Sequence, residues 1–231
     1  MLSLFIPAYN EGSVLDQSVS RVVDALSGVA FELFIIDDAS TDSTPDIGRR
    51  LEREDKRIRY VRYDFGPTRR ENLADSFRIA SGDVVGFIDA DLSASPEIIP
   101  RMLQLLSDYD IVIGSRRMAG AVVTRSLWRR VFTSSANLFL RVFFKSALSD
   151  HQCGLKLFRR NTLLELVSQA GYDRSLRRGF SWDTEILLRA EWRGLRICEV
   201  PVSWSDSGRS SVDVRRDWRM IPYIFGLRQR L

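Results

Sequence analysis

Short, almost uninterrupted apolar runs alternate with amphipathic stretches along the first half of this sequence. The apolar runs are typical of strands buried on both faces of a parallel sheet, and the stretches between them repeat apolar residues at helical spacing. We therefore expect strands at residues 2–7, 31–36, 57–62, 84–89 and 110–114, and helices at 14–26, 45–55, 69–80 and 95–106. This alternation predicts a single Rossmann-like α/β domain with a largely parallel sheet flanked by helices.

The pattern changes after Ser115. A long helix rich in aromatic residues is expected at 125–145, and shorter helices are expected at 162–167 and 182–192. A strand is expected at 195–204 and a loop at 208–211. The predicted division is a domain over 1–211, built from the halves 1–115 and 116–211, followed by a basic amphipathic helix over 212–231.

The charge distribution also divides the chain. Residues 1–110 contain 12 basic and 20 acidic side chains, whereas residues 111–231 contain 22 basic and 10 acidic ones. Of the 34 basic residues, 31 are arginines, whose planar guanidinium groups bind phosphate through two points. Genomic bias explains much of the arginine content but not its placement. The division indicates one half that holds a metal and a nucleotide, and another that meets an anion or an anionic surface.

Several classes of protein are disfavoured. The first residues are typical of a strand rather than a secretion signal, and no apolar run approaches the ~18 residues of a membrane-spanning helix. Cys153 and Cys198 lack the spacing of a zinc site or a disulfide framework. We therefore expect a reduced, cytoplasmic protein.

Candidate chemistry gathers where predicted strands end. Asp89 and Asp91 follow a buried strand and would point the same way, because side chains of extended backbone repeat every two residues. Two such carboxylates fit Mg²⁺ or Mn²⁺, which would itself hold the phosphates of a nucleotide. The alternative is a loop with two solvated aspartates, one of which caps the next helix. The sequences PAYNE and DDAS lie at two further strand ends, and such ends meet at one edge of a parallel sheet.

An ordered set of motifs runs through nearly the whole chain. The motifs are PAYNE (7–11), DDASTD (37–42), DADL (89–92), GSR (114–116), DHQCGLKLFRR (150–160) and WDTEIL (182–187). Together they resemble the family 2 glycosyltransferases, and most closely the branch that makes dolichyl-phosphate or other polyprenyl-phosphate sugars. The resemblance implies a GT-A fold with a mixed, largely parallel sheet, and transfer of a sugar from a nucleotide-diphosphate donor with inversion at the sugar carbon.

The resemblance also implies a donor site. Pro7, Tyr9 and Glu11 would form the nucleoside cradle, and Asp38 would contact the base or the ribose with Asp37 supporting it. The plainer alternative for the paired acids is that they cap the following helix.

The metal part of the donor site is implied by the same resemblance. Asp89 and Asp91 would hold the metal on the donor diphosphate, with the backbone of Ala90 close by. Ser93 stands where many relatives have Gln, so one metal ligand would be a hydroxyl or water. Arg209 lies in a loop that closes on the diphosphate in relatives.

Two further positions depart from the family pattern. Ser211 replaces the usual Lys of the closing loop, and residues 67–72 replace a common Gly-Lys-Gly segment. These departures bear on donor preference and catalytic strength more than on the fold.

The acceptor decides which catalytic groups are needed. A phosphate monoester has its second pKa near ~6 and is already ionised at neutral pH, so it needs arginines to position it rather than a base. Arg117, with Arg129 or Arg130, resembles the arginines that receive this phosphate. A sugar hydroxyl would instead need a base, for which Asp183 or Glu185 is the candidate. Both acids lie at a helix start, where they also suit the helix dipole.

Three residues of the DHQC segment have plain alternatives. Asp150 could order a turn, Cys153 could be a small buried hydrophobe, and His151, the only histidine, is better explained as structural or solvated than as catalytic. The aromatic stripe at 128–144 suits a protein core, but its arginines also fit a helix that lies on a membrane surface.

The sequence thus predicts a metal-dependent glycosyltransferase that carries mannose or glucose from GDP-mannose or UDP-glucose to polyprenyl phosphate. It would sit peripherally on the cytoplasmic face of an anionic membrane through its terminal helix. One alternative is a soluble or glycan acceptor. The other is a nucleic-acid-binding domain, which no motif supports.

Overall fold

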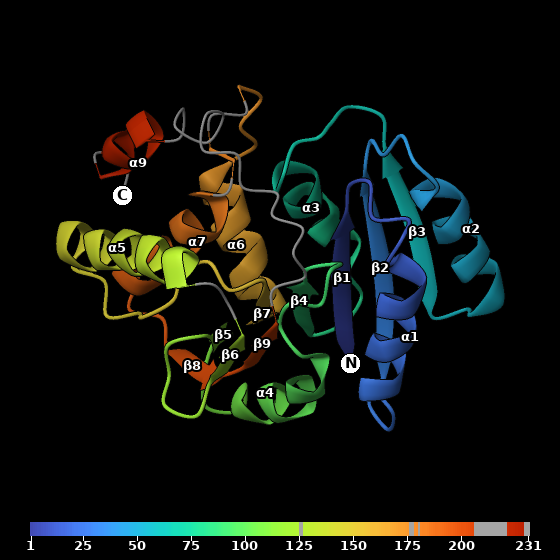
Figure 1. Cartoon of the computed structure of the whole chain (residues 1–231), viewed down its shortest axis with the longest axis horizontal. Helices are drawn as coiled ribbons and strands as arrows, with labels where there is room; N and C mark the ends of the chain where they lie inside the picture. Colours follow the sequence, from blue (N-terminus) through green and yellow to red (C-terminus); the bar gives the residue numbers. More distant parts are fainter. Residues whose placement is uncertain (125–126, 176–177, 180, 206–220, 229–231) are drawn as a thin grey trace.

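A mixed seven-stranded sheet organises the part of the chain that the computed structural model describes, which is residues 1–124, 127–175, 178–179, 181–205 and 221–228 (Figure 1). The strands are β1 (Leu2–Ala8), β2 (Phe31–Asp38), β3 (Ile58–Tyr63), β4 (Val84–Ile88), β5 (Ile111–Ser115), β7 (Leu155–Arg159) and β8 (Ile197–Pro201). Their order is β3-β2-β1-β4-β7-β5-β8, and β7 runs antiparallel to both of its neighbours. A separate parallel pair joins β6 (Val122–Thr124) to β9 (Ser203–Ser205).

Helices cover both faces of this sheet. The helices that do so are α1 (Leu15–Ala25), α2 (Thr44–Glu54), α3 (Glu71–Ser76), α4 (Ile99–Leu105), α6 (Arg160–Ala170) and α7 (Ser181–Trp192). Helices α5 (Leu127–Phe144) and α9 (Ile221–Leu227) form a separate cluster with α7. Strand β1 sends Leu4 and Ile6 into a core with α1, α2 and α4, and sends Phe5 into a second core with α3, α6 and α7. Most positions of β1 and β2 are apolar because both faces of these strands are buried, and two polar exceptions, Ser3 and Glu32, are hydrogen-bonded to each other.

The structure confirms the expected α/β fold, with three differences in detail. Strand β7, which the hydrophobic pattern did not single out, inserts between β4 and β5, so the second half of the sequence completes the sheet of the first. The strand expected at 195–204 divides into β8 in the main sheet and β9 in the small pair. The helix expected at 69–80 is shorter, because α3 gives way to a 3₁₀ turn at Phe77–Ile79.

Helices α5 and α9 lie together at the end of the molecule away from α2 (Figure 1). Leu227 of α9 is buried with Leu140 and Phe144 of α5, and the ring of Phe225 contacts Phe139 edge-on at 5.6 Å between centroids. Part of the aromatic stripe is therefore core. Among the described helices, none combines the length and the apolar composition that crossing a bilayer requires. Most of the terminal helix expected at 212–231 lies outside the described residues.

Candidate active site

The carboxyl ends of β1, β2 and β4 meet at one edge of the sheet, as their motifs predict. Parallel pairing places Ala8 beside Asp37 and Phe5 beside Phe87. The loops that follow β1 and β2 are joined, because the amide of Asn10 donates to Ser40 Oγ at 3.0 Å and the amide of Thr41 donates to Asn10 Oδ1 at 2.8 Å. The PAYNE and DDAS segments therefore form one surface.

The predicted nucleoside cradle lies on this surface. Pro7 is half-buried at the end of β1, and the Tyr9 side chain is exposed. The amide of Glu11 donates to Thr44 Oγ1 at 2.9 Å, which fixes the loop against the start of α2. The exposed phenol ring of Tyr9 can offer a face to a flat ligand such as a nucleobase.

Asp37 is a supporting residue. Its buried carboxylate accepts hydrogen bonds from the amide of Ser40 at 2.8 Å, from the Tyr60 hydroxyl, and from Arg62 at 2.8 Å. Burial and the bond to Asp37 raise the pKa of Tyr60 to about 12, so this hydroxyl keeps its proton and remains a donor at neutral pH. Asp37 thus orders the turn beneath the predicted donor site.

Asp38 faces the chain segment that follows β3. Its carboxylate accepts hydrogen bonds from the amides of Thr68 and Arg69, at 2.6 and 2.9 Å, and from Asn72 Nδ2 at 2.6 Å. Burial raises the pKa of Asp38, while these hydrogen bonds oppose the rise. In this structure the carboxylate of Asp38 holds residues 68–72 in place, and its contact with the base or ribose stays a prediction.

Asp89 is held from two sides. Its Oδ1 accepts a hydrogen bond from Arg70 at 2.9 Å, and its amide donates to the carbonyl of Gly154 at 3.0 Å. A Cβ atom on Gly154 would lie 1.9 Å from Asp89 Oδ2, so only glycine leaves room for the carboxylate. Burial raises the pKa of Asp89, and the Arg70 charge opposes that rise.

Asp91 interacts with its own loop. Its two oxygens accept hydrogen bonds from the amide of Ser93 at 3.0 Å and from the Ser93 hydroxyl at 2.7 Å, while Ala90 between the two aspartates is buried. The described residues contain no group of three or more His, Cys, Asp or Glu side chains that could hold a metal. Asp89 and Asp91 are partly exposed carboxylates one residue apart, and such a pair fits Mg²⁺ or Mn²⁺ bound through one or two carboxylates and completed by water and substrate phosphates.

Asp183 is a buried counter-ion. It accepts hydrogen bonds from Arg70 at 2.9 Å and from Lys156 Nζ at 2.8 Å, and the three side chains are almost wholly buried. Burial alone would raise the pKa of Asp183, but the two cations hold it below its usual range. A carboxylate with both oxygens in ion pairs inside the protein does not fit the predicted role of a base for an acceptor hydroxyl.

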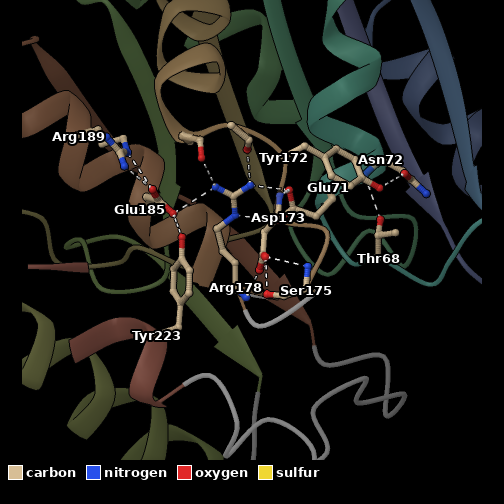
Figure 2. Close-up of polar contacts among 12 residues, drawn as sticks. Thr68, Glu71, Asn72, Tyr172, Asp173, Ser175, Arg178, Glu185, Arg189 and Tyr223 are labelled. Carbon is tan, nitrogen blue, oxygen red and sulfur yellow. Dashed lines mark hydrogen bonds and ion pairs between the residues drawn. The ribbon is translucent and has the colours of Figure 1, made fainter. Parts of the chain in front are cut away.

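Glu185 is engaged in the same way, in a cluster around Arg178 (Figure 2). Arg178 is buried and donates to both oxygens of Glu71, to Glu185 Oε2 at 3.3 Å, and to two backbone carbonyls. Arg189 and the hydroxyl of Tyr223 in α9 also contact Glu185. Glu185 therefore ties α7 to the terminal helix and is not presented to an acceptor.

The GSR and DHQC motifs meet through an ion pair. Arg116 donates to both oxygens of the buried Asp150, each at 2.7 Å, and its guanidinium lies over the Trp204 ring. The amide of Gln152 also donates to Asp150 Oδ1 at 3.3 Å, so Asp150 orders the turn before β7, as predicted, and in addition joins that turn to the GSR motif. The neighbouring Arg117 is exposed, as an acceptor-binding group must be. The side chains of the α5 residues Arg129 and Arg130, and all of Arg209, lie outside the described part.

Two further DHQC residues are structural. His151 is buried and its ring nitrogens contact Ser146 Oγ at 2.8 Å and Asn137 Oδ1 at 3.2 Å. Burial lowers its pKa to about 4, so it is neutral at pH 7. Burial also raises the pKa of Cys153 to about 12, which leaves an unreactive thiol.

Sequence reasoning missed the residues that surround the carboxylates. Gly154 and Lys156 belong to a motif that was recognised, but their contacts with Asp89 and Asp183 were not predicted. Arg70 lies in the segment noted only as a departure from the family pattern. The one available signal was the unusual pair of arginines at 69–70 beside predicted acidic strand ends.

The fold and the carboxylate edge together define a GT-A type α/β domain. The chain belongs to the family described as Glycosyl transferase family 2, whose model matches residues 3–167. It is 35% identical to glycosyltransferase AglD of Haloferax volcanii over 94% of this chain, although it spans only 35% of that relative's length. It is 28% identical to the undecaprenyl-phosphate mannosyltransferase of Micrococcus luteus, over 98% of this chain and 97% of the relative.

A solved structure supports the fold. Glucosyl-3-phosphoglycerate synthase from Mycobacterium tuberculosis, in complex with Mn²⁺, uridine diphosphate and phosphoglyceric acid, superposes with a TM-score of 0.70. The match covers 100% of this chain and 78% of that one at 19% identity, which bears on the fold alone.

Proposed function

We propose that this protein transfers a mannose or glucose from GDP-mannose or UDP-glucose to a dolichyl or other polyprenyl phosphate, with inversion. The observation that carries the proposal is the ion pairing of the two residues that could act as a base. Asp183 and Glu185 are both locked in buried ion pairs, whereas Arg117 is exposed. A phosphate acceptor is already ionised and needs positioning rather than a base. The similarity to the undecaprenyl-phosphate mannosyltransferase over nearly the full length of both chains supports the same acceptor.

The donor site is the carboxylate edge. Tyr9 and the joined loops after β1 and β2 bind the nucleoside of the donor. Asp91, which is hydrogen-bonded to Ser93, binds next to the donor diphosphate. Bound Mg²⁺ or Mn²⁺ neutralises charge on the departing nucleoside diphosphate. Exposed Arg117 holds the acceptor phosphate. The other arginines that the sequence predicts here are Arg129 or Arg130 for the acceptor and Arg209 for the donor, and their side chains lie outside the described part of the structure.

We further propose that the surface shared by α5 and α9 rests on the membrane that carries the acceptor. Leu138, Val142 and Phe225 are exposed there, and Arg141 is exposed beside them. Apolar side chains with neighbouring cations suit a peripheral position on anionic lipid, at the cytoplasmic face. Sedimentation with anionic liposomes, but not with neutral ones, is the expected result, and Val142→Glu should reduce it. Equal recovery in the supernatant with and without anionic liposomes would contradict this part of the proposal.

A soluble phosphate-bearing acceptor is the second candidate. The solved glucosyl-3-phosphoglycerate synthase has the same fold and was crystallised with phosphoglyceric acid, a compound that also presents an ionised phosphate. Exposed Arg117 suits either acceptor, so only the assay separates them.

The test is a transfer assay with Mn²⁺ or Mg²⁺. Labelled GDP-mannose and UDP-glucose are each offered with a short polyprenyl phosphate, with phosphoglyceric acid, and without acceptor. We expect label in the organic phase with one donor, lost in Asp91→Asn and strongly reduced in Arg117→Met. Arg193→Met, which removes an exposed pair with Glu165, serves as the matched control. No lipid product from either donor, by protein that still binds nucleotide, would refute the polyprenyl-phosphate acceptor.

A further inference from the structure

Arg178 is a buried cation that the proposed transfer reaction does not use. Its side chain is 1% exposed, and all five of its N–H groups donate hydrogen bonds inside the protein (Figure 2). Two of these bonds go to the two oxygens of Glu71 and one goes to Glu185 Oε2 at 3.3 Å. The other two go to the carbonyls of Ala170 and Gly171, at 3.1 and 2.6 Å. A planar guanidinium that is bonded at every donor fixes the groups around it.

Glu71 connects Arg178 to the donor edge. It is 1% exposed and begins α3, within the segment 68–72. The same segment holds the carboxylate of Asp38, to which the amide of Thr68 and Nδ2 of Asn72 each donate at 2.6 Å. These three residues of the segment lie within five consecutive positions. A displacement of Glu71 therefore also displaces the groups that hold Asp38.

Glu185 connects Arg178 to the terminal helix. Its Oε1 accepts hydrogen bonds from Arg189, and its Oε2 accepts from Arg178 and from the hydroxyl of Tyr223 in α9. Helix α9 has seven residues, too few for a helix to be stable alone in water, so its order depends on contacts with the rest of the protein. Leu227 supplies an apolar contact of this kind and Tyr223 supplies a polar one.

We propose that Arg178 is a positioning residue that couples the donor edge to α9, so that binding of the donor nucleotide stabilises α9 against local opening. Opening of α9 removes the Tyr223 hydroxyl from Glu185 and admits water to the buried ion pairs. The hold of Arg178 on Glu71, and with it the hold of segment 68–72 on Asp38, is then weaker. The nucleotide therefore binds the protein with α9 closed better than the protein with α9 open.

This inference rests on the proposed donor site and makes no demand on the acceptor. It adds a consequence for the surface shared by α5 and α9, which we propose to rest on the membrane. The donor-loaded protein keeps α9 closed for a larger fraction of the time than the empty protein does. The membrane-facing surface is therefore better ordered when a sugar is ready for transfer.

The experiment is amide hydrogen exchange of the full chain with Mn²⁺, alone and with saturating UDP or GDP, followed by mass spectrometry of peptides that span 68–72 and 221–227. We expect the nucleotide that binds to slow exchange in both peptides, by about fivefold at 221–227, the lower end of couplings between distant sites. Tyr223→Phe should keep the slowing at 68–72 and lose it at 221–227. Tyr63→Phe is the matched control, because it removes a hydroxyl that donates to Asp75 of α3 at 2.8 Å, outside the Arg178 cluster. It should respond as wild type does.

Three results would overturn the inference. The first is slowing at 68–72 without slowing at 221–227 in the wild-type protein, which would leave the donor site intact. The second is an undiminished response at 221–227 in Tyr223→Phe, because α9 would then respond by another route. The third is binding of neither nucleotide, which would refute the proposed donor and the coupling together.

A purely structural role for the Tyr223 hydroxyl predicts a different pattern. Tyr223→Phe would then speed exchange at 221–227 by the same factor with and without nucleotide, and this result would also contradict the coupling. The variant removes one hydroxyl and keeps the apolar contact of Leu227, so the test does not depend on a variant that fails to fold. The expected exchange pattern together with absent lipid transfer would refute the proposed acceptor and leave the role of Arg178 intact.

Discussion

Gly154→Ala tests the close approach between β7 and the strand-end carboxylate. The added Cβ would lie 1.9 Å from Asp89 Oδ2 and 2.4 Å from its Cγ. An ordinary carbon–oxygen contact is about 3.3 Å, so the carboxylate must move by roughly 1.4 Å. The backbones cannot separate easily, because the Asp89 amide is bonded to the Gly154 carbonyl. A shift of this size should cost about a hundredfold or more in transfer rate and about 1–3 kcal/mol of stability.

The assay combines transfer kinetics with urea unfolding of the same preparations. Gly226→Ala is the matched control, because a Cβ there meets nothing within 4 Å, and its stability should stay within about 0.5 kcal/mol of wild type. Asp89→Ala removes the atoms that clash most, so the stability cost of Gly154→Ala should largely disappear in that background. Wild-type activity and stability in Gly154→Ala, or an undiminished stability cost in the Asp89→Ala background, would show that the Gly154 approach does not fix the Asp89 carboxylate.

Three further predictions concern the buried polar groups. Arg178→Met should cost about 3–5 kcal/mol in urea unfolding, because it leaves Glu71 and Glu185 buried without their cation; a cost no larger than that of an exposed pair would contradict it. Tyr223→Phe should cost about 1 kcal/mol, and an unchanged unfolding midpoint would show that its bond to Glu185 contributes nothing. The pKa of His151 is about 4 in the folded protein and about 6.5 in the unfolded chain, so between these pH values only the unfolded chain gains a proton. The free energy of unfolding therefore falls as pH falls through that window, by up to about 3 kcal/mol. The stability difference between wild type and His151→Gln should therefore narrow from pH 7 to pH 4.5, and a constant difference would contradict the assignment.

Much of the fold follows from local sequence patterns. Buried parallel strands need apolar residues on both faces, so β1, β2 and β4 are visible as apolar runs, and the acids that follow them mark the carboxyl edge. Strand β7 is different. It takes its place only by pairing antiparallel with β4 and β5, for example Val85 with Phe158, and such pairing leaves no periodic signal in one short segment.

The alternation of strands and helices, the family, and the edge where the acids gather can all be predicted from the residues alone, because each depends on neighbouring residues or on motif order. The contacts of each acid, in contrast, arise only when distant segments meet in the folded chain. Asp89, Asp91 and Asp183 are chemically identical in the sequence. Their cations lie 19 residues away for Arg70 and Asp89, and 113 residues away for Arg70 and Asp183. Asp89 is paired with one cation and stays partly exposed, whereas Asp183 is sealed between two cations, and both pairings form between distant segments rather than within one.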